Sequence, residues 1–264
     1  MYISNTAKNA LPIKDLNSVY VVADFDRTIT NGSSQTSWSI LSSSNLVPKS
    51  YIKERNELYD YYRPIEVDST IDSELKMKLV KEWFQKHIEL FIKYQLTEEI
   101  FNEAATNLRV MEFRNGAKEF LKFLHQNNIP LIIISAGIGN FIESFLKHYD
   151  CYYDNIYISS NKILFENGIA SGIDKNIIHS LNKNEVSLPK YITEKLKNRN
   201  QVILLGDQVS DLKMVDKKAH DSVLTIGFVA NDSQNQLDFL KEHFDIVCDI
   251  NNDYYDVEKV LFDY

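Results

Sequence analysis

Residues 19–30, "VYVVADFDRTIT", begin as a continuous apolar run and end in acidic and hydroxyl side chains. The run from Val19 to Ala23 is rich in β-branched residues, which predicts a strand buried on both faces of a parallel sheet. Asp24 and Asp26 follow, where this strand reaches the surface. Ligands of open α/β sheets bind beyond the carboxyl ends of strands, so both carboxylates are placed for one site. Taken alone, the two acids fit a solvated strand end equally well.

Residues from about 50 to about 112 have helical periodicity and contain no convincing strand. The preceding passage "NGSSQTSWSILSSSNLVPKS" is polar and predicts only short helical pieces. Within the helical part, Thr70 or Asp72 is placed to cap a helix. The apolar residues that recur there at roughly helical spacing are Leu75, Leu79, Trp83 and Leu90.

From Asn115 the pattern changes to helices that alternate with short apolar strands. The helix "NGAKEFLKFLHQNN" leads into "IPLIII", and the later strands are "NIYISS", "KILF", "QVILLGD", "SVLTIGF" and "DIVCD". This alternation predicts an α/β fold with a doubly wound parallel sheet, interrupted by a β-hairpin in "SSNKILFENGIASG". We expect a core domain made of residues 1–31 and 115–264, and a smaller helical domain, residues 32–114, inserted into it.

Two further predicted strands end in small or acidic residues. "IPLIII" ends in Ser135-Ala136-Gly137, whereas "QVILL" ends in Gly206-Asp207, with Asp211 four residues later. In a parallel sheet these ends share one edge with the end of the first strand. The residues expected to cluster there are Asp24, Asp26, Ser135, Asp207 and Asp211.

Carboxylates crowded at one edge repel one another unless a cation lies between them. Oxygen ligands favour Mg²⁺ over zinc, and the six histidines are scattered along the chain. The backbone N–H groups of Ala136 and Gly137, expected at the start of the helix "NFIESFLKHY", are placed to bind an anion. A cation, a hydroxyl and such a helix start together indicate a phosphate site.

Composition narrows the choice of partners. The chain has 264 residues, of which 44% are hydrophobic and 25% charged, with 29 basic and 37 acidic residues and a net charge of −8. Without a basic stripe, a nucleic-acid partner is disfavoured. No apolar run approaches the roughly 20 residues of a membrane span or the core of a signal peptide. We expect a cytoplasmic protein in which Cys151 and Cys248 are buried thiols.

Four motifs carry a family resemblance. "DFDRT", "SAG", a downstream lysine and "GDQVSD" resemble those of the haloacid dehalogenase-like phosphohydrolase superfamily. "IEVD", "VKEWF", "SAGIGN", "HSLNKN" and "LLGDQVSDLKMVD" are similar to the pyrimidine 5′-nucleotidase branch, over residues from about 20 to about 250. The resemblance implies a Rossmann-like core, a helical cap that closes over the substrate, and hydrolysis of nucleoside 5′-monophosphates with Mg²⁺ as cofactor.

The resemblance also implies roles for the strand-end residues. Asp24 is expected to attack phosphorus and form an aspartyl-phosphate, while Asp26 protonates the leaving oxygen and later takes a proton from water. The implied Mg²⁺ ligands are Asp24, Asp26 through its backbone carbonyl, Asp207 and Asp211. The implied phosphate-binding residues are Thr28, which also orients the nucleophile, Ser135, Ala136, Gly137 and Lys183.

The phosphate-binding lysine needs a choice among Lys175, Lys183 and Lys190, which spacing alone leaves nearly tied. We choose Lys183 because "HSLNKN" is similar to the family motif. In the cap, the implied substrate-binding residues are Glu66, which accepts a hydrogen bond from an exocyclic amino group, Trp83 or Phe84 as a stacking face, and His87, where the animal nucleotidases have serine.

Two alternatives stay open at this stage. The same motifs fit a phosphatase for another small metabolite, such as a sugar phosphate or phosphoserine. A binding protein on the same scaffold is less favoured, because every catalytic position is filled.

Overall fold

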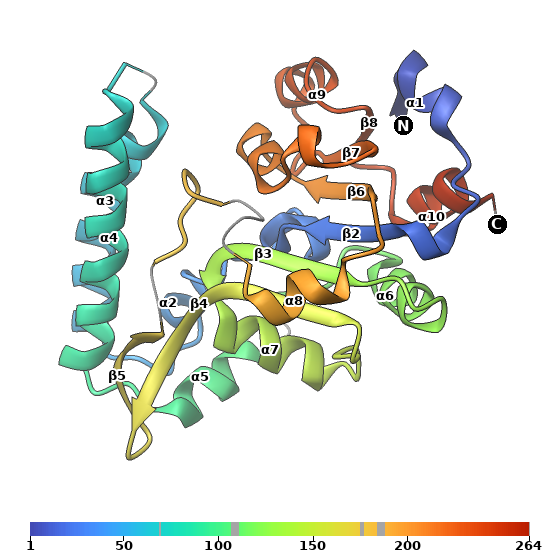
Figure 1. Cartoon of the computed structure of the whole chain (residues 1–264). Helices are drawn as coiled ribbons and strands as arrows, with labels where there is room; N and C mark the ends of the chain where they lie inside the picture. Colours follow the sequence, from blue (N-terminus) through green and yellow to red (C-terminus); the bar gives the residue numbers. More distant parts are fainter. Residues whose placement is uncertain (69, 107–110, 175–176, 184–187, 264) are drawn as a thin grey trace.

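The centre of the molecule is an eight-stranded sheet. A computed structural model of the chain describes residues 1–68, 70–106, 111–174, 177–183 and 188–263. The strands are β1 (Tyr2–Ile3), β2 (Val19–Ala23), β3 (Leu131–Ile138), β4 (Ile156–Glu166), β5 (Ile169–Asp174), β6 (Gln201–Gly206), β7 (Ser222–Phe228) and β8 (Ile246–Cys248). Their order is β1-β8-β7-β6-β2-β3-β4-β5 (Figure 1). Neighbours from β8 to β4 are parallel, whereas β1 and β5 pair antiparallel at the two ends.

Helices cover both faces of the sheet. Every residue of β2 is buried, and alternate side chains enter different cores. Val21 belongs to the core that includes α6 (Ala117–Gln126), α7 (Gly139–His148) and α10 (Tyr254–Phe262). Val22 belongs to a second core on the opposite face, which includes α8 (Lys190–Lys195) and α9 (Gln234–Lys241). The predicted doubly wound α/β fold is therefore confirmed, as is burial of the first long strand on both faces.

The far edge of the sheet differs from the prediction. "NIYISS" and "KILF" are two halves of one strand, β4, because no breaker separates them. The first half pairs with β3 and the second with β5, which confirms the predicted hairpin. Its turn, Asn167-Gly168, has positive φ angles of 52° and 78°, typical of a tight hairpin turn. β1 was not predicted, because two residues show no period and its partner β8 lies more than 240 residues away.

The helical segment divides into two parts. α3 (Lys49–Val67) and α4 (Ser73–Lys93) stand side by side next to the sheet (Figure 1). Asp72 caps α4 by accepting hydrogen bonds from the N–H groups of Glu74 and Leu75. The short α2 (Ile40–Ser43) precedes this pair. α5 (Glu98–Ala105) packs instead on α7 of the core, where the rings of Phe101 and Phe141 stack. The division into domains at residues 32 and 114 stays a prediction.

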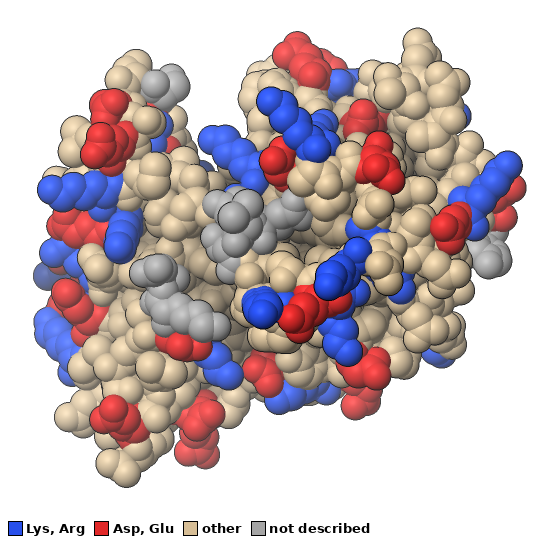
Figure 2. All heavy atoms as spheres, viewed as in Figure 1, with Lys and Arg blue, Asp and Glu red and all other residues tan. Residues whose placement is uncertain are grey.

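The distribution of surface charges and the burial of the two cysteines are those of an ordinary globular protein. Figure 2 shows basic and acidic side chains interspersed over one face, with a hollow between the α3–α4 pair and the core. Cys151 and Cys248 are both buried and unbridged, as predicted. Within the described ranges, the helices are too short or too polar to cross a bilayer.

Candidate active site

The carboxyl ends of β2, β3 and β6 face the α3–α4 pair across a cavity of about 230 Å³. The chain surfaces here because each buried strand is followed by polar residues, and parallel strands end at one edge. The structure brings nearly all predicted site residues to this cavity. They are Asp24, Asp26, Glu66, Trp83, His87, Ser135, Ala136, Gly137, Lys183, Asp207 and Asp211.

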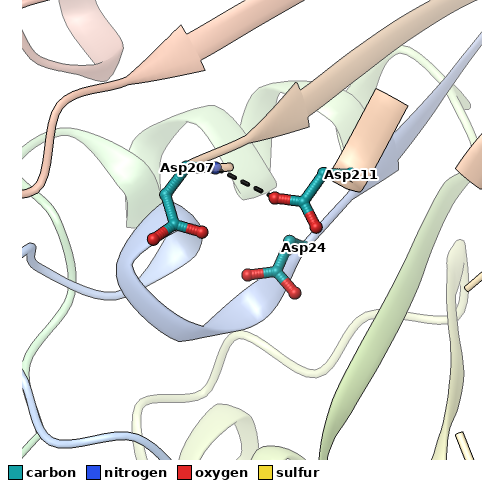
Figure 3. Close-up of side chains that lie close together, drawn as sticks. All are labelled: Asp24, Asp207 and Asp211. Atoms are coloured by element: carbon teal, nitrogen blue, oxygen red, sulfur yellow. Dashed lines mark hydrogen bonds between the residues drawn. The ribbon is translucent and has the colours of Figure 1, made fainter. Parts of the chain in front are cut away.

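Three buried carboxylates that line this cavity face one another (Figure 3). Asp24, Asp207 and Asp211 each offer an oxygen atom within 4.8 Å of the other two. Burial raises the pKa of Asp24 to about 7, and burial together with the neighbouring charges of Asp211 and Asp24 raises the pKa of Asp207 well above its ordinary value. Crowded buried carboxylates of this kind fit a divalent cation with oxygen ligands, such as Mg²⁺.

Asp211 is fixed by the backbone that follows β6. Its Oδ2 accepts hydrogen bonds from the N–H groups of Asp207 at 3.2 Å and Gln208 at 3.0 Å. A Cβ atom at Gly206 would lie 2.6 Å from Cβ of Asp211, so only glycine permits this close approach. The spacing of "GDQVSD" therefore turns Asp211 back toward the strand end.

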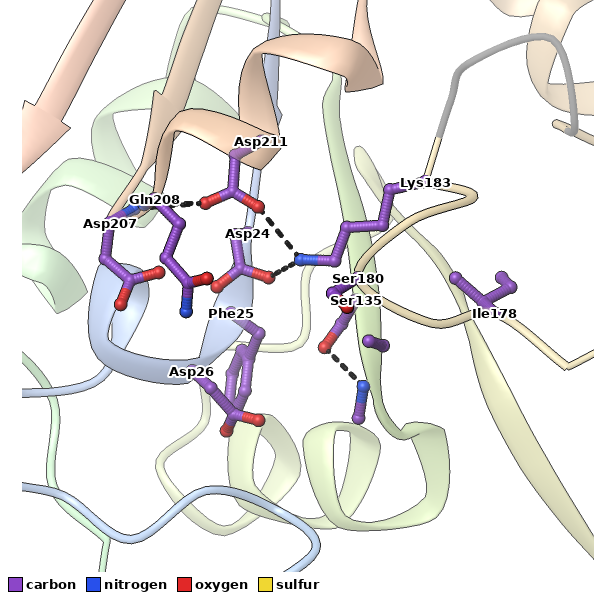
Figure 4. A network of polar contacts seen from close by, with 12 residues as sticks. Asp24, Phe25, Asp26, Ser135, Ile178, Ser180, Lys183, Asp207, Gln208 and Asp211 are labelled. Carbon is purple, nitrogen blue, oxygen red and sulfur yellow. Dashed lines mark hydrogen bonds and ion pairs between the residues drawn. The ribbon is translucent and has the colours of Figure 1, made fainter. Parts of the chain in front are cut away.

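Lys183 joins two of these carboxylates (Figure 4). Its Nζ donates to Oδ1 of Asp24 and, at 3.1 Å, to Oδ1 of Asp211, and its side chain is only 7% exposed. Burial by itself would lower the pKa of Lys183, but the charges of Asp211 and Asp24 outweigh burial and raise it, so the amine stays protonated. Lys190, by contrast, is 90% exposed and pairs with Glu194. Lys175 lies outside the described residues.

The carboxylate of Asp26 lies apart from the three-carboxylate cluster (Figure 4). It accepts hydrogen bonds from the backbone N–H of Ser37 at 3.1 and 3.2 Å, and from the hydroxyl of Ser37 at 3.1 Å. Burial raises the pKa of Asp26, whereas the hydrogen bonds from Ser37 lower it. A raised pKa favours the protonated form that a general acid needs. The Asp26 side chain is not one of the three clustered carboxylates, so a metal-binding role for its backbone carbonyl stays a prediction.

The end of β3 differs in one detail from the prediction. The predicted helix "NFIESFLKHY" is confirmed as α7, which begins at Gly139, but Ala136 and Gly137 belong to the strand and not to the helix start. Pairing of Ile138 with Asn161 on β4 prolongs the strand. The N–H of Gly137 donates to Oγ of Ser135 at 3.0 Å, and the Ser135 hydroxyl lies in the cavity lining.

Thr28 is the predicted site residue that the structure does not bring to the cavity. It is fully buried, and its hydroxyl has no hydrogen-bond partner among the described residues. The physical reason is a tight turn: Arg27 has a positive φ of 65°, which directs the chain inward at Thr28. The carbonyl of Thr28 accepts hydrogen bonds from Arg114 and Tyr254, while Arg27 itself lines the cavity.

The α3–α4 side of the cavity contains the predicted substrate-binding residues. Glu66 on α3 accepts a hydrogen bond from the hydroxyl of Ser180 at 2.7 Å and forms an ion pair with Arg63. Trp83 on α4 stacks on the ring of Tyr62, with ring centroids 6.1 Å apart and planes inclined by 12°.

His87, one turn after Trp83, is buried beside Arg55. Burial first, and the positive charge of Arg55 second, lower the pKa of His87 to about 3. Its imidazole is therefore neutral at physiological pH. Within the described part of the chain, Nδ1 of His87 has no hydrogen-bond partner.

Sequence reasoning missed several cavity residues. Trp38, from the Ser-rich passage, lines the cavity and donates from Nε1 to the carbonyl of Ala136 at 2.8 Å. Arg27 lay inside a quoted motif, but side-chain direction in a turn is not visible in sequence. Arg55 and Arg63 lie on the face of α3 that lines the cavity, and their spacing was the available signal.

The parallel sheet, the carboxylates at its strand ends and the helical pair beside them define a haloacid dehalogenase-like phosphohydrolase. A phosphoserine phosphatase solved as a phospho-aspartyl intermediate analogue shares this fold, with a TM-score of 0.57 and 18% identity over 92% of this chain and 97% of that one. The chain belongs to the pyrimidine 5′-nucleotidase (UMPH-1) family, whose model matches residues 24–263. It is accordingly a phosphoric monoester hydrolase of the 5′-nucleotidase kind.

Individual relatives give the extent of the similarity. The 7-methylguanosine phosphate-specific 5′-nucleotidase of Mus musculus is 32% identical over 237 residues, which cover 87% of this chain and 79% of the mouse protein. A putative cytosolic 5′-nucleotidase 3 of Caenorhabditis elegans is 28% identical over 86% of this chain and 64% of its own length. The crystal structure of cytosolic 5′-nucleotidase IIIB bound to cytidine has a TM-score of 0.80 and 27% identity, covering 92% of this chain and 85% of that one.

Proposed function

We propose that this chain hydrolyses nucleoside 5′-monophosphates, with pyrimidine bases preferred, in a Mg²⁺-dependent reaction through an aspartyl-phosphate. The observation that carries the proposal is the position of Asp24. Asp24 lies at the end of β2 and accepts a hydrogen bond from Lys183. It lines a cavity whose opposite wall contains Glu66 and Trp83. A cytoplasmic location stays a prediction.

The first half of the reaction uses Asp24 as the nucleophile. An oxygen of its carboxylate attacks phosphorus, and the bond from phosphorus to the nucleoside O5′ breaks. Lys183 is a permanently charged group beside the attacking carboxylate, so it is placed to neutralise charge on the phosphoryl oxygens. The Ser135 hydroxyl supplies a hydrogen-bond donor to the same group.

The second carboxylate moves the protons. Asp26, with its raised pKa, gives a proton to the leaving O5′ and then takes one from the water that hydrolyses the aspartyl-phosphate. The three hydrogen bonds from Ser37 hold it in one orientation throughout.

A divalent cation fits the remaining acidic groups. Asp24, Asp207 and Asp211, with the backbone carbonyl of Asp26, would hold Mg²⁺ through oxygen atoms alone. When bound, Mg²⁺ would neutralise charge on the transferred phosphoryl group.

The proposed pyrimidine preference is supported by the far wall of the cavity. The carboxylate of Glu66 is an acceptor, and the exocyclic amino group of cytosine is a matching donor. Ser180 and Arg63 hold this carboxylate in place. Among the relatives, the structure of cytosolic 5′-nucleotidase IIIB contains cytidine, whereas the mouse enzyme is named for 7-methylguanosine phosphate.

The test is phosphate release by the purified chain from CMP, UMP, N7-methyl-GMP, ribose 5-phosphate, phosphoserine and p-nitrophenyl phosphate, with Mg²⁺ and with excess chelator. We expect metal-dependent turnover with the highest kcat/KM on CMP or UMP. Asp24→Asn should abolish turnover of every substrate. Asp26→Asn should lower kcat on CMP by about 100-fold or more, but much less on p-nitrophenyl phosphate, whose leaving group needs no protonation.

Asp154→Asn is the matched control, because that side chain is 90% exposed and remote from the cavity lining. A higher kcat/KM on ribose 5-phosphate or phosphoserine than on any nucleotide would refute the substrate class while leaving the phosphatase chemistry. Equal loss on CMP and p-nitrophenyl phosphate in Asp26→Asn would remove Asp26 from the general-acid role.

A further inference from the structure

Arg55 lines the same cavity from α3. It lies on the same face of this helix as Tyr59 and Arg63. Its NH2 group donates to Oγ of Ser39 at 2.9 Å and its NH1 group to Oδ1 of Asn56 at 3.2 Å. Its guanidinium carbon lies 5.2 Å from the centre of the Tyr59 ring. The Nε–H is buried and has no hydrogen-bond partner among the described residues. Arg55 thus lines the cavity and has a donor that no described residue uses.

In the described part of the chain, the charge of Arg55 is offset only from a distance, by Asp60 of the same helix, which lies beyond ion-pair distance. Among the described residues, Arg55 has no carboxylate within ion-pair distance, whereas Arg63 is paired with Glu66. His87, which is buried beside Arg55, is neutral at physiological pH. The α3–α4 wall of the cavity therefore has a net positive charge that comes from Arg55. A partly buried cation without an anionic partner favours a ligand that supplies a further acceptor.

We propose that Arg55 is a specificity-determining residue, which donates a hydrogen bond to a carbonyl oxygen of a neutral base and disfavours a base that carries a positive charge. The inference rests on the proposed function and deepens it. Pyrimidines and N7-methylguanine both present a carbonyl acceptor, but N7-methylguanine also carries a positive charge on its imidazolium ring. The wall that contains Arg55 repels that charge, because Coulomb interactions are strong in a cavity that excludes most water.

The experiment compares Arg55→Met and Arg55→Gln with the wild-type chain on CMP, N7-methyl-GMP and ribose 5-phosphate. The matched control is Lys53→Met, which removes a cation from the same helix. The Lys53 side chain is 79% exposed and pairs with Glu57 at the surface. The ratio of kcat/KM for CMP to that for N7-methyl-GMP is the main readout. Ribose 5-phosphate has no base and reports on the chemistry alone.

We expect Arg55→Met to lower the CMP to N7-methyl-GMP ratio by about tenfold, the usual effect of losing a hydrogen bond to a charged group. Arg55→Gln keeps a hydrogen-bond donor without the charge. Its CMP to N7-methyl-GMP ratio should therefore lie between those of Arg55→Met and the wild-type chain. Hydrolysis of ribose 5-phosphate should stay within about twofold of wild type, and Lys53→Met should leave all three substrates unchanged.

Two results would overturn the inference. One is an unchanged ratio in Arg55→Met, and the other is an equal loss on all three substrates, which means that Arg55 only ties α3 to Ser39. Failure of the proposed function is distinguishable from both, because the wild-type chain would then prefer ribose 5-phosphate over both nucleotides before any substitution is made.

Discussion

Ser37 contacts Asp26 through both its backbone and its side chain, although the two residues belong to different segments of the cavity wall. The Ser37 hydroxyl donates to Asp26 and accepts from the N–H of Ile138 at 3.1 Å, so one buried oxygen joins the candidate general acid to the end of β3. The hydrogen bonds from Ser37 also lower the pKa of Asp26 against the opposing effect of burial. The orientation and the proton affinity of Asp26 thus depend on the same neighbour.

Replacement of Ser37 by alanine is expected to lower kcat on CMP by about tenfold, because Asp26 loses one of the bonds that orient it. The pKa of Asp26 should rise, so the alkaline limb of the pH profile of kcat should move to higher pH. Steady-state kinetics between pH 5 and 9 would measure both effects. Ser42→Ala is the control, because that hydroxyl is buried without a partner among the described residues. An alkaline limb that stays in place would contradict the role of Ser37.

At the scale of elements, the end of β3 fits against the segment that precedes α2. A Cβ atom on Gly137 would lie 2.1 Å from Oγ of Ser37, 3.0 Å from Oγ of Ser135 and 3.2 Å from Oδ2 of Asp26. No side chain fits there unless one of these groups moves. The absence of a side chain at Gly137 is therefore what lets β3 and the Ser37 segment meet around Asp26.

Gly137→Ala should lower kcat/KM on CMP by about 100-fold, the effect of displacing catalytic groups by roughly 1 Å. It should also lower the free energy of unfolding by about 1–3 kcal/mol through overpacking. Kinetics and urea denaturation would measure the two losses. The control is Gly172→Ala on β5, where an added Cβ has open space and the free energy of unfolding should change by less than about 1 kcal/mol. Wild-type activity in Gly137→Ala would show that the strand end tolerates displacement.

At the scale of the whole molecule, the acidic cluster costs stability in the absence of a cation. The pKa of Asp24 is about 7 in the folded chain against 3.8 for an ordinary aspartate. Between these values the folded state keeps a proton that the unfolded state has lost. The contribution of Asp24 to the free energy of unfolding is therefore complete below pH 4. It is lost as pH rises to 7, and the free energy of unfolding falls by up to about 4 kcal/mol.

Without metal, the stability of Asp24→Asn relative to wild type should rise by roughly 2–3 kcal/mol between pH 5 and pH 7.5, because asparagine has no proton to lose. Mg²⁺ should reverse the trend for wild type, since carboxylates bind it only when deprotonated. Urea denaturation at both pH values, with chelator and with Mg²⁺, measures these differences. Asp154→Asn should follow wild type throughout. A difference that does not grow with pH would show that the cluster is not strained by its own charge.

The strand ends show how far sequence reasoning reached. Asp24, Asp207 and Asp211 could be predicted to cluster because parallel strands end on one edge, whatever the packing of the helices. Thr28 follows Arg27, whose positive φ moves the threonine hydroxyl out of the cavity, and no sequence period encodes such a turn. Arg55 and Trp38 reach the cavity only through the way in which α3 and the Ser-rich segment pack beside the sheet.

The sequence by itself determined the alternation of strands and helices, the burial of β2 and the acidic strand ends, because these depend on local periodicity and on the common edge of parallel strands. Tertiary structure alone decided that Lys183 lies between Asp24 and Asp211, that Ser37 holds Asp26, and that Arg55 faces the cavity without an anionic partner among the described residues. These contacts join residues far apart in the chain, and their formation depends on side-chain packing that local patterns do not encode.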